Sequence, residues 1–177
     1  MLSNIADYVN GLATVYKYLF VFVTSMIPLI ELRGAIPFAY LFKAGDPSFN
    51  LVFGYVIIAI GNMIPVPIVF FFARKVLEWG ADKPVIGKFF TFCLNKGHKG
   101  GEKLKEKAGR SLFVALLLFV GIPLPGTGAW TGTLAASILD MDFKESVAAV
   151  ILGVALAGII VSIACVFGYG AWLGIAG

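Results

Sequence analysis

Glu31 and Arg33 stand two residues apart, and they are the only charged residues between Tyr18 and Phe42. Ionisable groups at membrane depth cost roughly 2.5–3.5 kcal/mol each on insertion scales, so they are rare and usually functional. A carboxylate in a low-dielectric cavity can bind and release a proton near neutral pH. An arginine can hold a phosphate or carboxylate through two parallel hydrogen bonds. The pair therefore predicts proton-coupled handling of an anion.

Helix-breaking residues surround this pair. Pro28 precedes it, Gly34 follows it directly and Pro37 comes one turn later. We expect an unwound backbone between Pro28 and Gly34, in which alternate residues share a face and both charged side chains reach one cavity. The alternative is an internal Glu31–Arg33 salt bridge that only holds the break together, because intramembrane charges usually pair.

A second break, without charge, follows the apolar run that starts at Ser111. Residues expected to shape it are Pro123, Pro125 and Trp130. Backbone N–H groups and one hydroxyl could form an anion-binding nest at a half-helix N-terminus, supplied by Gly126, Thr127 and Gly128. The alternative is that glycine and proline merely permit a tight turn.

Asn62 is a polar residue in the middle of another apolar run, just before Pro65 and Pro67. It either lines the same cavity as the charged pair or satisfies carbonyl groups that the prolines leave without a donor. Both interpretations remain open at this point.

Composition places the chain in a membrane. It is 59% hydrophobic and 14% charged, whereas soluble domains carry about 25% charged residues. Three uncharged runs, 47–73, 111–139 and 146–177, each exceed the roughly 20 residues that a crossing helix needs. We predict an all-α integral membrane protein. No cluster of residues has the spacing of a metal site or of intramembrane catalysis, so we expect no enzyme and no cofactor.

Positive charge is concentrated between Arg74 and Arg110, which hold ten Lys or Arg against four Asp or Glu. The positive-inside rule places the segment 73–110 in the cytoplasm of a protein of the cell's inner membrane. Its position between two apolar runs favours contact with lipid headgroups over nucleic-acid binding.

The two halves of the chain resemble each other, because Ile27-Pro28-Leu29 recurs as Ile122-Pro123-Leu124. We divide a single membrane domain into an amphipathic helix at 1–16, a first repeat at 17–72, the basic segment, and a second repeat at 111–177. Each repeat would be a re-entrant helical hairpin followed by a transmembrane helix, and the second would be inverted. The alternative is that each broken segment crosses as a kinked helix. The glycine-rich last span could support a homodimer.

Three motifs together resemble the putative small multidrug export protein family, which is distantly similar to the DedA/VTT membrane proteins. They are Glu31–Pro37 (ELRGAIP), Gly61–Pro67 (GNMIPVP) and Ile122–Gly132 (IPLPGTGAWTG). The resemblance covers nearly the whole chain and implies paired re-entrant hairpins. It assigns motif positions to Glu31, Arg33, Gly34, Pro37, Asn62, Pro65, Pro123, Pro125, Gly126, Thr127, Gly128 and Trp130.

We therefore expect a transporter with protons and membrane lipids as partners. It would move an anionic amphiphile, such as a lipid phosphate, or a small anion, through a site between two re-entrant hairpins. One alternative is a proton-coupled multidrug exporter, although Arg33 should repel cationic drugs. Another is a lipid scramblase or a non-transporting scaffold.

Overall fold

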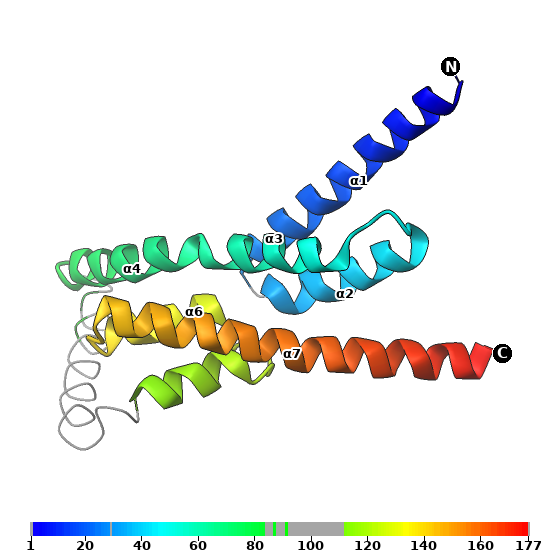
Figure 1. Cartoon of the computed structure of the whole chain (residues 1–177). Coiled ribbons are helices and arrows are strands. Elements are labelled where there is room, and N and C mark those ends of the chain that lie inside the picture. Colours follow the sequence, from blue (N-terminus) through cyan, green and yellow to red (C-terminus); the bar gives the residue numbers. More distant parts are fainter. Residues whose placement is uncertain (1, 29, 84–86, 88–90, 92–111, 177) are drawn as a thin grey trace. The chain divides into compact units, whose positions relative to one another are not determined.

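The computed structural model describes residues 2–28, 30–83, 87, 91 and 112–176, and most side chains from residue 13 to 168. Every regular element in those ranges is a helix (Figure 1). The helices are α1 (Leu2–Met26), α2 (Glu31–Gly45), α3 (Leu51–Met63), α4 (Pro65–Ala81), a helix at Leu112–Gly121, α6 (Ala129–Ile138) and α7 (Phe143–Ala176). The predicted all-helical class is confirmed for this part of the chain.

Within the part of the chain that the structure describes, two helical stretches are long and apolar enough to cross a membrane, namely Leu51–Phe72 and Phe143–Gly168. They correspond closely to the runs predicted to span. Both expose large apolar side chains; Val52 is 73% exposed and Phe167 is 74% exposed. Such surfaces suit contact with lipid chains rather than water.

Prolines interrupt the first of these stretches at Ile64, which is a turn between α3 and α4. Pro65 is the first residue of α4, a position that needs no N–H donor. Neither Pro65 nor Pro67 can donate to the carbonyl four residues earlier, so the helix hydrogen-bond ladder is broken at Gly61 and Met63.

The second part of α1 and all of α2 form an antiparallel helical hairpin, which we call hairpin 1 (residues 14–48). Lys17 on α1 contacts Asp46 just beyond α2. Further along, the ring of Phe20 lies 5.6 Å from that of Phe42 and 5.1 Å from that of Phe38. The chain therefore reverses direction at the break, which a kinked helix would not do.

The second break also reverses the chain. The helix Leu112–Gly121 and α6 form hairpin 2 (residues 112–138). A Cβ atom on Gly132 of α6 would contact the Val120 side chain and lie 3.3 Å from Leu116 on the other arm. Ten-residue arms are about 15 Å long, half of the roughly 30 Å hydrocarbon core of a bilayer.

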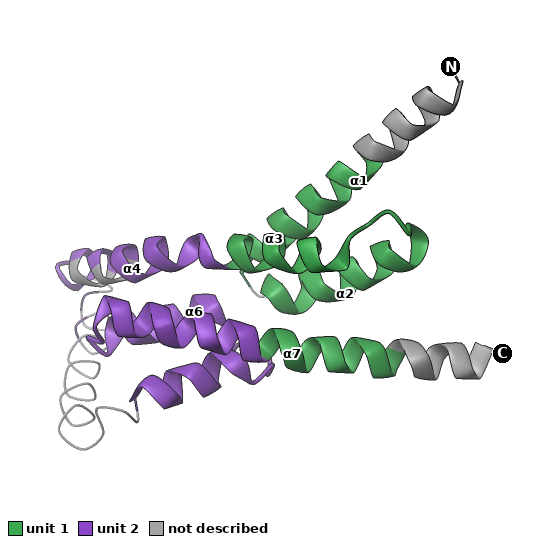
Figure 2. Cartoon of the chain, viewed as in Figure 1, with its two compact units in different colours: residues 1–62, 157–177 green, residues 63–156 purple. Residues whose placement is uncertain are grey.

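The chain forms two compact units (Figure 2). Unit 1 contains residues 1–62 and 157–177, and unit 2 contains residues 63–156. Unit 1 thus combines hairpin 1 with α3 and the second part of α7, whereas unit 2 combines hairpin 2 with α4 and the first part of α7. Each unit holds one hairpin, the start of the long helix that follows it, and the end of the other long helix.

Within unit 1, α3 approaches the first arm of hairpin 1 most closely at Gly61. A Cβ atom there would collide with the Ser25 side chain and lie 2.8 Å from the carbonyl oxygen of Phe22. Glycine is needed at this position because the neighbouring backbone occupies the space of a side chain.

Unit 2 repeats this contact. A Cβ atom on Gly153 of α7 would lie 2.7 Å from Val120 and 2.8 Å from the carbonyl oxygen of Leu117. When Ile122 is aligned with Ile27, Val120 corresponds to Ser25 and Leu117 corresponds to Phe22. Equivalent residues of the two hairpins thus pack against a glycine of the following long helix.

The starts of the two long helices also correspond. The Asn50 side chain accepts a hydrogen bond from the N–H of Phe53 at 3.1 Å, and the Asp142 side chain accepts one from the N–H of Glu145 at 3.3 Å. When Gly153 is aligned with Gly61, Asp142 corresponds to Asn50. Side-chain caps at matching positions therefore begin both helices.

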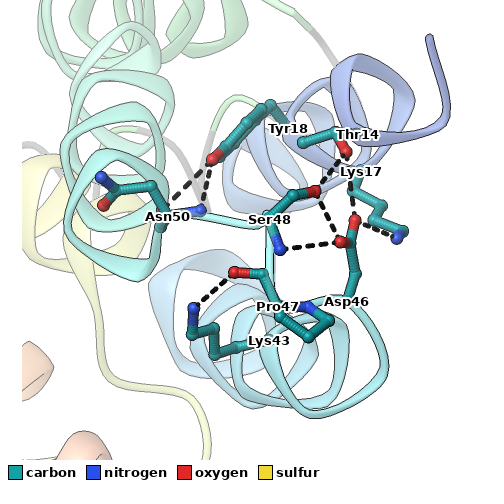
Figure 3. A network of polar contacts seen from close by, with 8 residues as sticks. All are labelled: Thr14, Lys17, Tyr18, Lys43, Asp46, Pro47, Ser48 and Asn50. Carbon is teal, nitrogen blue, oxygen red and sulfur yellow. Dashed lines mark hydrogen bonds and ion pairs between the residues drawn. The ribbon is translucent and has the colours of Figure 1, made fainter. Parts of the chain in front are cut away.

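Polar contacts close the open end of hairpin 1 (Figure 3). The Asp46 carboxylate accepts hydrogen bonds from Lys17 Nζ at 2.6 Å, from Thr14 Oγ1 at 3.1 Å and from the Ser48 N–H at 2.9 Å. The N–H of Asn50 donates to Tyr18 Oη at 2.7 Å. These contacts fix the loop after α2 against α1, so we call them the loop clamp.

The loop clamp predicts a pH-dependent stability. The hydrogen bond from Lys17, followed by those from Ser48, holds the pKa of Asp46 well below its usual range. A depressed folded-state pKa stabilises the fold above the unfolded value of about 4, and this contribution is lost as the pH falls below it. We expect Asp46→Asn to lower the melting temperature at pH 7, and the gap to wild type to narrow steadily as the pH falls below about 4.

The measurement is the melting temperature of the purified protein in detergent between pH 3 and pH 8. Asp82→Asn, at an exposed position outside the clamp, serves as the matched control and should give no pH-dependent gap. A gap for Asp46→Asn that persists unchanged at pH 3 would contradict the assignment.

Three expectations from the sequence have different outcomes in the structure. α1 continues without a break from Leu2 to Met26, so no helix end separates the predicted amphipathic helix at 1–16 from the first repeat. Most of the predicted basic segment, at 84–86, 88–90 and 92–110, lies outside the described residues. The predicted unwinding between Pro28 and Gly34 is longer than the observed break.

Candidate functional site

The described residues of the break at the tip of hairpin 1 are Ile27, Pro28 and Ile30, and α2 begins directly after them. The N–H of Glu31 donates to the carbonyl of Ile27 at 3.0 Å, and the N–H of Gly34 donates to the carbonyl of Ile30 at 2.9 Å. The expectation of an unwound Glu31–Gly34 segment is wrong, because Pro28 removes only its own donor and the next N–H groups find partners that start α2.

Glu31 and Arg33 therefore lie in the first turn of α2, where residues two apart point in different directions. Glu31 is 5% exposed, and Arg33 is half-buried. They do not share a face as a strand-like break would require. The Glu31 carboxylate still acts electrostatically on the Arg33 guanidinium, and a shared binding site for the two charges stays a prediction.

Glu31 has an unusual backbone. Its φ of 50° lies in the left-handed region, which costs a residue other than glycine roughly 1–2 kcal/mol. Strain of this kind persists where the surroundings impose it, and it is concentrated at functional sites. Glu31 also starts a helix, where the dipole favours a carboxylate.

The equivalent position in hairpin 2 is a glycine. Gly126 corresponds to Glu31 when Ile122 is aligned with Ile27. The φ of Gly126 is 83°. Both hairpins therefore need a left-handed residue at the same point of the turn. Hairpin 2 meets the need with the residue that has no strain there, whereas hairpin 1 places a buried glutamate.

The neighbours of Glu31 on α2 shape the tip. A Cβ atom on Gly34 would collide with the Ile30 side chain, so glycine lets Ile30 fold over the start of the helix. Pro37 lies inside α2 and cannot donate to the Arg33 carbonyl. Pro28 is exposed within the break itself.

The tip of hairpin 2 is largely closed on itself. The Thr127 N–H donates to the carbonyl of Leu124 at 3.2 Å, and its hydroxyl lies 2.9 Å from the carbonyls of both Leu124 and Ile122. In this structure the donors of Thr127 close the turn, and the predicted anion-binding nest stays a prediction. Gly126 and Gly128, with φ of 83° and 144°, provide the left-handed positions of that turn.

A comparison with protein families tests the resemblance. A family model described as putative small multi-drug export protein matches residues 31–160, well over half of the chain. The chain belongs to this family. The match begins at Glu31 and includes hairpin 2. Searches of curated proteins and of solved structures gave no match.

Membership of the small multi-drug export family, together with two long apolar helices, indicates a membrane protein. An export protein is consistent with a transporter rather than an enzyme. Among the residues that the structure describes, no three His, Cys, Asp or Glu side chains are grouped so that they could hold a metal ion.

The site residues predicted for this family member divide between the units. Unit 1 holds Glu31, Arg33, Gly34, Pro28, Pro37 and Asn62, and unit 2 holds Pro65, Pro123, Pro125, Gly126, Thr127, Gly128 and Trp130. Asn62 is 1% exposed, and its Oδ1 atom has no hydrogen-bond partner. A buried acceptor without a donor costs free energy. It leaves both interpretations of Asn62 open, because freed carbonyls would be satisfied by the amide N–H groups and not by Oδ1.

Sequence patterns missed Thr133, which is fully buried on α6 and whose hydroxyl also has no partner. Ser137, one turn later on the same face, donates to the carbonyl of Phe70 on α4 at 2.7 Å. The contrast makes Thr133 a further candidate polar contact in unit 2. A lone threonine in an apolar run carries no signal of its own.

A hydroxyl cluster in unit 1 was also missed. Tyr55 Oη of α3 lies 3.3 Å from Tyr40 Oη of α2 and 2.5 Å from Ser162 Oγ of α7. Tyr55 donates to Tyr40, Ser162 also lies within hydrogen-bond distance of the Gly158 carbonyl, and either hydroxyl can be the donor between Tyr55 and Ser162. The cluster links α2 of hairpin 1 to α3 and to the second part of α7 within unit 1.

Gly126 offers a clean test of the left-handed turn. A Cβ atom there would meet nothing within 4 Å, so a substitution reports backbone conformation alone. We expect Gly126→Ala to destabilise the protein by about 1–2 kcal/mol, and Gly126→Asn by less, because asparagine tolerates this region. Melting temperatures in detergent provide the measurement. Gly45→Ala, also in open space, is the control, and an equal effect there would contradict the argument.

Proposed function

We propose that the protein is a proton-coupled transporter of the cell's inner membrane that moves an anionic amphiphile, such as a lipid phosphate, or a small anion. Glu31 would carry the proton and Arg33 would contact the anion. The two hairpin tips would supply the polar groups of the transport path.

The observation that carries the proposal is the conformation of Glu31. A glutamate that is 5% exposed occupies a left-handed position with φ of 50°, at the point where hairpin 2 uses glycine. A residue that is both buried and strained is costly to keep, and the cost is understandable when the carboxylate performs a task. Uptake and release of a proton is the task that a carboxylate beside a guanidinium can perform.

Arg33 supports the choice of an anion. Its guanidinium is always charged and can bind a phosphate or carboxylate in bidentate fashion. Hairpin 2 carries no Lys or Arg, since none occurs between Arg110 and Lys144. Any anion would therefore depend on Arg33 and on backbone dipoles.

Membrane re-entry is supported by the lengths of the arms. The ten-residue arms of hairpin 2, about 15 Å long, cannot cross a hydrocarbon core of roughly 30 Å. In hairpin 1 the 15 residues of α2 are also too short, at about 22 Å, and the loop clamp joins α2 to α1 at the open end. If each hairpin returns to its own side and Leu51–Phe72 crosses once, hairpin 2 starts from the other side. Positive charge in segment 73–110 then places this side in the cytoplasm, and the repeats are inverted.

A second candidate is proton-coupled export of drug-like compounds, which the family description favours. It requires Glu31 but not Arg33, because a fixed positive charge repels cationic drugs. The dependence of transport on Arg33 therefore separates the two functions.

The experiment is proton flux into proteoliposomes that contain the purified protein, measured against a panel of lipid phosphates, small anions and cationic dyes. We expect a substrate-dependent flux with an anionic member. Flux with cationic dyes alone would favour drug export. No flux with any member, from protein shown to be folded and inserted, would overturn proton-coupled transport in favour of a scramblase or a scaffold.

A further inference from the structure

A cavity of about 180 Å³ opens between the two arms of hairpin 2. Leu112, Leu116 and Phe119 line it from the first arm, and Ala135 and Ala136 line it from α6. The remaining lining residues are also apolar. Leu139 and Met141, just after the hairpin, complete the lining, and the whole cavity lies within unit 2.

The chemistry of the cavity excludes polar ligands. No Asp, Glu, Lys or Arg occurs from residue 112 to residue 139, so nothing on either arm could hold a charged group. A dry apolar cavity of about 150 Å³ is known to take a molecule as small as benzene. A slender hydrocarbon fits this space, whereas a helix about 10 Å wide does not.

The rim connects the cavity to the outer surface of the hairpin. Phe119 lines the cavity and is also 41% exposed, and the neighbouring Leu118 and Leu134 are 43% and 40% exposed. In the proposed membrane setting this surface faces acyl chains. A chain can enter the cavity from there without passing any polar group.

We propose that hairpin 2 is a lipid-binding element whose cavity holds an acyl chain of a membrane phospholipid. Small side chains create the room, because Ala115 and Ala135 stand where larger residues would fill the space between the arms. The bound acyl chain fills the gap between the two arms and so completes the packing of hairpin 2. The proposal rests on the membrane setting of hairpin 2, not on the transported substrate.

The test is photolabelling of the full chain in phospholipid vesicles that contain a phospholipid with a diazirine in mid-chain. Labelled residues are mapped by mass spectrometry. We expect labelling of the cavity residues to exceed that of equally exposed residues on α3 and α7. The double variant Ala115→Phe, Ala135→Leu should reduce cavity labelling roughly tenfold, because it replaces several apolar contacts with the chain. Val114→Leu, on the same arm but outside both the lining and the rim, should leave it unchanged.

Two results would overturn the proposal. One is labelling of the cavity residues that is no denser than labelling of α3 and α7. That result would mean that the acyl chain has no preferred site in the cavity or that another part of the protein covers it. The other is labelling that the double variant does not reduce although the variant keeps its melting temperature. Labelling of α3 and α7 reports membrane insertion separately, so a failure of the membrane setting is distinguishable from a failure of this site.

Discussion

Glu31→Gly is expected to abolish proton-coupled transport while leaving the protein as stable as wild type, within about 1 kcal/mol. Glycine relieves the left-handed strain at φ 50°, worth roughly 1–2 kcal/mol. It also gives the unfolded chain more freedom, which costs about 0.4–1 kcal/mol. The two effects nearly cancel, and hairpin 2 already shows glycine in this position at Gly126.

A purely structural Glu31 predicts a different outcome. If the carboxylate only neutralises Arg33, its removal leaves a half-buried charge without compensation, and breaking such a pair typically costs about 3–5 kcal/mol. The protein would then melt many degrees lower in both Glu31→Gly and Glu31→Gln. Folded, inactive variants support the transport function, and misfolded ones support the scaffold.

Two measurements make this comparison, namely the melting temperature in detergent and the substrate-dependent proton flux in proteoliposomes. Glu145→Gln is the matched control, because Glu145 is also in the first turn of a helix but is exposed. We expect wild-type flux from the control and at least a tenfold loss from both Glu31 variants, roughly what general acid–base groups contribute at minimum. Retention of flux in Glu31→Gln would contradict a proton-carrying role.

The sequence predicted the elements better than their ends. Apolar runs located the two long helices, and prolines located both breaks, because composition and proline geometry act locally. The start of α2 at Glu31 was missed because it depends on whether the N–H groups of Glu31 and Gly34 find carbonyl partners. That outcome is decided by the path of residues 27–30 and not by residue type.

For Glu31 the sequence predicted burial but not backbone conformation. Burial of Glu31 followed from its apolar surroundings, whereas its positive φ had no sequence signal because glutamate rarely adopts it. Contacts between distant residues were also hidden, since Lys17–Asp46 depends on the register of hairpin 1 and Tyr55–Ser162 depends on where α7 packs. Such pairs become visible only once the helices are placed within a unit.

Internal repetition was visible in one tripeptide and proves much more detailed in the structure. Three features recur at corresponding positions of the two halves. They are the glycine contacts of the long helices, the side-chain caps of those helices and the left-handed residues of the hairpin tips. Side chains at these equivalent points differ, as Ser25 and Val120 do, so a sequence comparison finds little there. The two tips share a left-handed residue at equivalent positions, whereas α2 begins at Glu31 and α6 begins only at Ala129.

The repeated glycine contacts give the second large prediction. Gly61→Ala and Gly153→Ala are each expected to destabilise the protein by about 1–3 kcal/mol through overpacking. In both, the new Cβ atom would lie 2.8 Å from a backbone carbonyl oxygen, which cannot rotate away as a side chain can. The gain in helix propensity of about 1 kcal/mol that alanine normally brings is therefore outweighed.

Gly168→Ala on α7 is expected to change the stability in the opposite direction. A Cβ atom there meets nothing within 4 Å, so only the gain in helix propensity remains. Melting temperatures should fall for Gly61→Ala and Gly153→Ala, by similar amounts, and hold or rise for Gly168→Ala. A similar fall in both halves is what equivalent contacts require. If Gly61→Ala lowers stability and Gly153→Ala does not, the two long helices are not held against their hairpins in the same way, and the repeat loses its structural basis.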